Sequence, residues 1–218
     1  SHELRTPLTL INGHLEILKQ KIEFEDNKHI QEIQRNGNRL LKLINDILKL
    51  SKAESGKYKL FYKQGGALDE VKALFQSFQS YAEMHSISYL LDCKVDVYFD
   101  FNKRFIYSSE GLNIILTNLL SNAFKFTPDE GQIKVVVVPN DDTLKISIID
   151  NGIGISSESL PNIFDRFFQE DGKQQRAYDS SGIGLSLVRE LTLLHGGTIL
   201  VENNEHGGCT FTFWLKSG

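Results

Sequence analysis

Two hydrophobic periods divide the chain near residue 56. Before that point, apolar residues recur at alternating spacings of three and four, the heptad pattern of helices that pack side by side. The polar stretch EFEDNKH separates two such runs, which predicts an antiparallel helical hairpin. After residue 56, short runs typical of strands are mixed with longer helical runs.

The hairpin has a continuous apolar seam on each helix. The seam positions are Leu4, Leu8, Ile11, Leu15, Leu18 and Ile22 in the first run and Ile30, Ile33, Gly37, Leu40, Ile44 and Ile47 in the second. Because two helices with wide apolar faces cannot bury them alone, we expect a second copy to complete a four-helix bundle, making a homodimer. The alternative is that the hairpin packs on the rest of its own chain.

A change in pattern within SKAESGKYKL places a domain boundary, giving a hairpin at 1–56 and a second domain at 57–218. The second domain is expected to be an α+β sandwich with helices on one face of a mostly antiparallel sheet. Its expected helices lie at 68–85, 104–126 and 184–195, and its expected strands at 59–64, 94–101, 133–139, 144–150, 197–203 and 209–215.

Composition narrows the class of protein. The 218 residues have a net charge of −4, which favours no nucleic-acid partner, since such proteins carry basic patches. The two cysteines lack the spacing of metal ligands and are expected to be free thiols. No apolar run approaches the ~20 residues of a membrane span. The chain starts without Met inside a helical pattern, so we expect part of a longer protein, with any membrane anchor elsewhere.

The first helix displays a candidate nucleophile. In the heptad register, His2 and Thr6 fall on outward positions one turn apart. A neutral imidazole nitrogen can attack phosphorus if an acceptor holds the proton of the other nitrogen, and Glu3 is the nearest carboxylate. Pro7 should kink the helix here. The alternative is an ordinary exposed histidine.

The helical segment NLLSNAFKFTP aligns polar side chains. Asn118, Asn122 and Lys125 lie at i, i+4 and i+7 and share one face. The amide oxygen of Asn122 suits Mg²⁺, which takes few protein ligands beside phosphate oxygens, and Lys125 would offset phosphate charge. The alternative is the polar face of an amphipathic helix.

Two glycine-rich segments complete the candidate site. In IIDNGIGI, Asp150 ends a strand and could accept from an adenine amine, while Gly152 and Gly154 would allow a flat base to approach; a tight turn is the alternative. In SSGIGLSLV, Gly182 and Gly184 open a helix whose amides could bind phosphate. The long polar loop at 169–181 fits a lid.

In this order, the motifs resemble the core of bacterial sensor histidine kinases. SHELRTPLT resembles the phosphoacceptor box of that family, and NLLSNAFKFTP, DNGIGI, IFDRFFQ and GIGLSLV resemble its ATP-binding boxes. The sequences of these motifs also resemble those of hybrid sensor kinases of the Bacteroidetes type.

The resemblance implies a fold and a set of residues. The fold would be a hairpin contributing half of a dimeric four-helix bundle, followed by an α/β sandwich ATPase domain of the gyrase and histidine-kinase type. His2 would be phosphorylated, Glu3 would act as acid or base, and Thr6 would position water for dephosphorylation. The implied nucleotide residues are Asn118, Asn122, Lys125, Asp150, Gly152, Gly154, Ile155, Phe164, Gly182, Gly184, Leu185 and Thr210. Asn122 would hold Mg²⁺, Phe164 would anchor the lid, and Thr210 would orient water near Asp150.

The implied activity is ATP-dependent phosphorylation of His2 and transfer to an aspartate of a response-regulator receiver domain, with possible phosphatase activity. The chain would be the cytoplasmic portion of a sensor anchored in the bacterial inner membrane. One alternative is a dimeric ATP-binding switch of the gyrase-like class that phosphorylates nothing. Another is a serine kinase of the anti-sigma type.

Overall fold

The computed structural model describes residues 11, 13, 15–16, 27–94, 105–140, 142–170 and 182–217. His2, Glu3 and Thr6 lie outside this part of the chain, as do most of the expected strand at 94–101 and most of the expected lid. The predictions for these segments therefore stay predictions.

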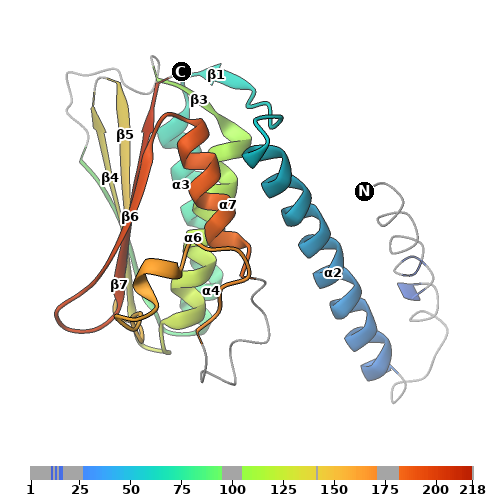
Figure 1. Ribbon diagram of the computed structural model, residues 1–218. Helices are drawn as coiled ribbons and strands as arrows, with labels where there is room; N and C mark the ends of the chain where they lie inside the picture. The colour runs from blue at the N-terminus through green and yellow to red at the C-terminus, as the bar shows by residue number, and fades with distance from the viewer. Residues whose placement is uncertain are drawn as a thin grey trace.

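A long helix, α2 (Asn27–Glu54), forms the second half of the expected hairpin (Figure 1). Its seam is divided: Ile30 and Gly37 are buried, whereas Ile33, Leu40 and Ile47 are 50%, 48% and 42% exposed. The Gln34 amide donates to the Glu16 carboxylate, which ties α2 to the preceding apolar run. One line of seam residues is thus covered within the chain, and a second line faces outward.

The second domain is built on a five-stranded sheet in the order β2-β4-β5-β7-β6. The strands are β2 (Ser88–Cys93), β4 (Gln132–Asn140), β5 (Thr143–Asp150), β6 (Thr198–Asn203) and β7 (Cys209–Lys216). β2 is parallel to β4, and the other neighbours are antiparallel. Two further strands, β1 (Tyr62–Gln64) and β3 (Ile106–Ser108), form a small antiparallel pair. The mostly antiparallel sheet confirms the predicted α+β class.

Helices cover one face of the sheet (Figure 1). They are α3 (Ala67–Ser77), α6 (Ser109–Phe126) and α7 (Gly184–Leu194), with the short α4 (Gln79–Met84) and a 3₁₀ turn, η1 (Leu160–Asn162). The core between the layers joins apolar side chains of α6 and α7 to the inward residues of β4, β5 and β7. Burial of this face, rather than helix propensity alone, stabilises the domain.

Three sequence predictions need correction. The helix expected at 104–126 begins with β3 and starts only at Ser109, because the Ser108 hydroxyl accepts from the Gly111 amide as an N-cap, at 3.4 Å. The helix expected at 68–85 is two helices, α3 and α4, with a break at Phe78. Strand β2 was not expected at all.

The hairpin helix α2 lies against the second domain, beside α7. Lys49 Nζ is 3.5 Å from Glu110 Oε1 in the first turn of α6, and the Tyr58 hydroxyl donates to the same oxygen at 2.9 Å. Near the end of α2, Glu54 forms an ion pair with Arg166. Apolar contact accompanies these pairs, since Leu50 belongs to the core of the domain.

Candidate functional site

Strand alternation places Asp150 inside the domain. Leu144, Ile146, Ile148 and Asp150 are buried on one face of β5, because successive strand residues point to opposite sides. Asp150 is the last residue of that strand, where the apolar core opens into a pocket. The Asp150 carboxylate thus continues a row of apolar side chains. Because it is buried, it needs hydrogen-bond donors.

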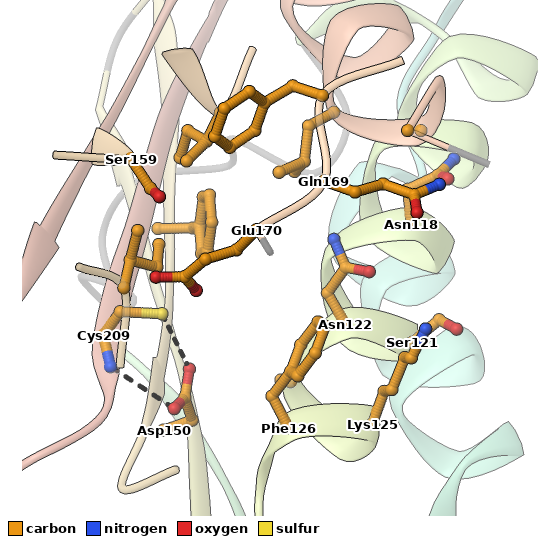
Figure 2. A pocket seen from close by; sticks show the side chains of 18 of the residues that line it. Asn118, Ser121, Asn122, Lys125, Phe126, Asp150, Ser159, Gln169, Glu170 and Cys209 are labelled. Atoms are coloured by element: carbon orange, nitrogen blue, oxygen red, sulfur yellow. Dashed lines mark hydrogen bonds between the residues drawn. The ribbon is translucent and has the colours of Figure 1, made fainter. Parts of the chain in front are cut away.

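Those donors come from the turn after β5 and from the start of β7. Asp150 Oδ1 accepts from the Gly152 amide at 2.9 Å and from the Cys209 amide at 3.3 Å, and Oδ2 accepts from the Cys209 thiol at 3.2 Å (Figure 2). Burial raises the pKa of the Cys209 thiol, and the charge of Asp150 raises it further. The thiol therefore stays protonated and can donate.

The structure places Cys209, rather than Thr210, next to Asp150, so the expected role of Thr210 is corrected. Ile149 pairs with Thr210 across β5 and β7, which leaves Asp150 and Cys209 as neighbours on the inward face. The Thr210 hydroxyl points to the other side and donates to Asn204 Oδ1 at 2.7 Å. Alternation along β7, where Cys209, Phe211 and Phe213 are buried, was the sequence signal for this.

Helix α6 supplies the opposite wall. Asn118, Ser121, Asn122 and Lys125 project from it into the pocket, across from Asp150 and Cys209 (Figure 2). The Asn118 amide also donates to the Ile114 carbonyl at 2.8 Å, which fixes its orientation. The predicted polar face therefore exists and lines a cavity rather than bulk solvent.

Two glycines permit close contacts between the motifs. A Cβ at Gly184 would lie 2.6 Å from Asn118 Oδ1, so a larger residue at the start of α7 would require the Asn118 side chain to move. A Cβ at Gly152 would lie 2.4 Å from the Phe126 carbonyl oxygen at the end of α6. These contacts bring segments far apart in the sequence to one pocket.

The cavity has a volume of about 220 Å³. Most predicted nucleotide residues line it: Asn118, Asn122, Lys125, Asp150, Gly154, Ile155, Gly182, Gly184 and Leu185. Gly152, Phe164 and Thr210 do not. Gly152 instead holds Asp150 through its amide, and the Phe164 ring packs edge-on against Phe211, with centroids 6.4 Å apart.

Sequence reasoning missed several lining residues. Cys209 and Phe211 come from β7, and Lys42 and Asp46 come from α2. Gln169 and Glu170, which also line the pocket, belong to the start of the expected lid. Within the described residues, no group of three or more His, Cys, Asp or Glu is placed to hold a metal ion. The amide oxygen of Asn122 does fit Mg²⁺, because this ion keeps few protein ligands and takes most of its oxygens from phosphate and water.

Two family models match the chain. Residues 107–218 match the histidine kinase-, DNA gyrase B-, and HSP90-like ATPase model, which spans the pocket and most of the sheet. The chain belongs to this ATPase family. Residues 1–56 match the His Kinase A phospho-acceptor domain. The pairing of the two domains confirms the predicted class, the core of a sensor histidine kinase.

Curated relatives align with nearly the whole chain. The chain is 34% identical over 222 residues to hybrid signal transduction histidine kinase D of Dictyostelium discoideum, covering 99% of this chain and 14% of that protein. It is 36% identical to the circadian input-output histidine kinase CikA of Synechococcus elongatus, covering 99% and 29%. It is 35% identical to histidine kinase P4 of Formosa agariphila, covering 100% and 16%. The chain thus spans less than a third of these relatives.

Solved structures share the fold. Full-length ShkA in complex with AMPPNP has a TM-score of 0.82 at 24% identity, covering 100% of this chain and 45% of that one. Histidine kinase ThkA in complex with the response regulator protein TrrA has a TM-score of 0.67 at 22% identity, covering 100% and 59%. None of the helices in the described ranges is long and apolar enough to cross a membrane.

Proposed function

We propose that this sensor-kinase core transfers the γ-phosphoryl group of ATP to His2 and then passes it to an aspartate of a receiver domain. The observation that carries this proposal is the pocket that joins Asp150, the polar face of α6 and the glycine-bounded start of α7. That pocket lies in the chain's ATPase domain, and a phospho-acceptor domain precedes it.

Asp150 and α6 would bind opposite ends of the nucleotide. The adenine amine would donate to Asp150 Oδ2, whose orientation the thiol of Cys209 fixes. The phosphates would then extend toward Asn118, Asn122 and Lys125 and the start of α7. Mg²⁺, held by Asn122 and phosphate oxygens, would offset charge on the transferred group.

The transfer step forms one bond and breaks one. A lone pair on an imidazole nitrogen of His2 attacks the γ-phosphorus, and the bond from that phosphorus to the β,γ-bridging oxygen breaks, which releases ADP. Glu3 would accept the proton from the second imidazole nitrogen. Positioning supplies most of the catalysis, because phosphoryl transfer needs little covalent chemistry from the protein.

The proposed kinase function implies two partners, a second copy of the chain and a receiver domain. The outward line of Ile33, Leu40 and Ile47 on α2 fits a second copy of the chain, as in a four-helix bundle. A receiver domain would take the phosphoryl group, since the related kinase ThkA is known in complex with a response regulator. Thr6 would position water for hydrolysis of the phosphoryl group on the partner regulator, the dephosphorylating reaction. We further propose that 1–56 is the dimerising unit, 57–218 the catalytic unit, and the chain the cytoplasmic part of a membrane-anchored bacterial sensor.

Radiolabelled ATP tests the central step. The wild-type chain should acquire label that is lost in acid, because phosphohistidine is acid-labile. His2→Gln should lose all label while AMPPNP still binds, and His14→Gln, a second histidine before residue 27, should keep it.

Three results would contradict the proposal. Label that survives in His2→Gln would exclude His2 as acceptor. Acid-stable label would favour the serine-kinase alternative. ATP hydrolysis without any labelled protein would favour a switch of the gyrase-like class.

A further inference from the structure

Helix α2 contributes two charged residues to the wall of the nucleotide pocket. Lys42 and Asp46 line the same cavity as the asparagines of α6. They are four residues apart, so they lie on one face of α2, one turn from each other. The same face carries Lys49, which contacts Glu110 of α6. The hairpin therefore forms part of the pocket as well as packing beside it.

The geometry of α2 and α6 places Lys42 on the phosphate side. Lys49, near the end of α2, contacts Glu110 in the first turn of α6. From this contact the two helices run in roughly opposite directions (Figure 1). Moving back seven residues to Lys42 covers about 10 Å, and moving forward eight residues from Glu110 to Asn118 covers about 12 Å. By this count of residues Lys42 lies at about the level of Asn118 along α6. Asp150 lies across the pocket from Asn118 (Figure 2).

Asp46 sits between two ammonium groups. Burial against the second domain raises the pKa of its carboxyl group, and the charges of Lys42 and Lys49 act in the opposite direction. A half-buried carboxylate at a phosphate site is unfavourable for an anionic ligand, and a lysine beside it is favourable. The two side chains should therefore affect nucleotide affinity with opposite signs.

We propose that Lys42 binds the polyphosphate tail of a nucleoside triphosphate and that Asp46 is its counter-charge in the empty pocket. The nucleotide would then be held jointly by the hairpin and the ATP-binding domain. This inference rests on the proposed function, since it concerns the same pocket. It adds that α2 distinguishes nucleotides by their number of phosphates.

Calorimetric titration of the complete chain with AMPPNP, ADP and adenosine tests this role, without and with Mg²⁺. Lys42→Gln should weaken AMPPNP binding roughly fivefold, ADP binding less and adenosine binding not at all, since a partly exposed charge pair contributes modestly. Asp46→Asn should strengthen AMPPNP binding about twofold to threefold without Mg²⁺, because it removes a like charge. Lys52→Gln, an exposed lysine in the last turn of the same helix, should change none of these affinities.

Two results would overturn the role of Lys42. One is an AMPPNP affinity in Lys42→Gln equal to that of the wild type. The other is an equal loss for AMPPNP and adenosine, which would mark a change of pocket shape rather than of charge. If the wild type binds neither AMPPNP nor adenosine, the proposed function fails together with this inference.

Discussion

Asp150 shows how a buried carboxylate can remain available to a ligand. Its two oxygens accept three hydrogen bonds from the chain, two at Oδ1 and one at Oδ2. A carboxylate can accept about four, so Oδ2 keeps capacity for the amine of a base. The donor that fixes Oδ2 is a thiol, which is weaker than a hydroxyl. The strength of this one contact should therefore affect nucleotide affinity.

We expect Cys209→Ala to weaken AMPPNP binding about fivefold, because a hydrogen bond of this kind contributes on the order of 1 kcal/mol. Cys209→Ser should bind at least as tightly as the wild type, since a hydroxyl is a stronger donor than the thiol it replaces. Equilibrium titration measures both. Thr210→Val is the matched control and should have little effect on binding. A larger loss in Thr210→Val than in Cys209→Ala would restore the role first expected for Thr210.

For single residues, the sequence was informative where the chemical type of a side chain and its position in a strand or helix period both indicated the same site. Asp150, Asn118 and Asn122 were found because their spacing follows a strand end and a helix face. The role of Thr210 came from the family resemblance alone, and the alternation of β7 points instead to Cys209. Lys42 and Asp46 gave no signal, because charged residues on a long helix look like a solvated face.

At the scale of helices and strands, His195 connects α7, β3, β7 and α6. It follows α7, its Nδ1 donates to the Leu191 carbonyl at 2.7 Å, and its Nε2 accepts from the Ser108 amide at 3.3 Å. Its own carbonyl accepts from Lys216 at the end of β7. The ring packs so tightly under α6 that a Cβ at Gly111 would lie 2.3 Å from Cε1. A neutral imidazole makes both hydrogen bonds, because Nδ1 carries the proton and Nε2 accepts. In the protonated ring Nε2 also carries a proton and can no longer accept from the Ser108 amide.

The pH dependence of stability should reflect this histidine. Burial lowers the pKa of His195 below its ordinary value of 6.5. The unfolded chain therefore binds this proton more readily, so the stabilisation is complete above about pH 6.5 and is lost as pH falls toward the folded pKa. Urea unfolding of the wild type between about pH 7.5 and pH 5.5 should show this loss.

In His195→Gln the free energy of unfolding should be lower, and its change across this pH range smaller. His206→Gln, an exposed histidine in the β6–β7 turn, should keep the wild-type slope. Equal slopes for the wild type and His195→Gln would contradict the assignment.

Element prediction succeeded where a strand pattern was long and failed where elements were short. β5 and β7 alternate in sequence, β4 is a longer apolar run with four consecutive valines, and all three were found close to their observed bounds. β3 is only three residues long and precedes α6 directly, so its apolar residues read as part of the helix. β2 was missed because SYLLDC has neither strict alternation nor turn residues on both sides.

For the whole molecule, α2 has two apolar interfaces and one of them is open. Leu50 and its neighbours pack on the catalytic domain, whereas Ile33, Leu40 and Ile47 recur every seven residues on an exposed line. Heptad spacing of this kind matches the seam of helices that associate between chains. The sequence predicted the seam, but no pattern in it indicated that the other side of α2 would dock on the ATP-binding domain.

We expect Leu40→Glu to raise the dimer dissociation constant by a factor on the order of a hundred or more, because the change removes a half-buried apolar side chain from each subunit. Sedimentation equilibrium measures this constant. Leu200→Glu, an exposed leucine on the edge strand β6, should leave it unchanged. An unaltered dimer in Leu40→Glu would show that this line of residues is not the interface.

The contact between Gly152 and the end of α6 has a consequence for engineering. The Phe126 carbonyl lies where a side chain at 152 would be, and it also accepts from the Ile153 amide at 3.3 Å. The asparagine-bearing helix and the aspartate-bearing turn are therefore matched surfaces, although 25 residues separate Phe126 from Gly152. Replacing either α6 or the turn after β5 alone with the segment of a distant kinase should give insoluble chimeras. Replacing 109–154 as one block should preserve the contact between Gly152 and the Phe126 carbonyl.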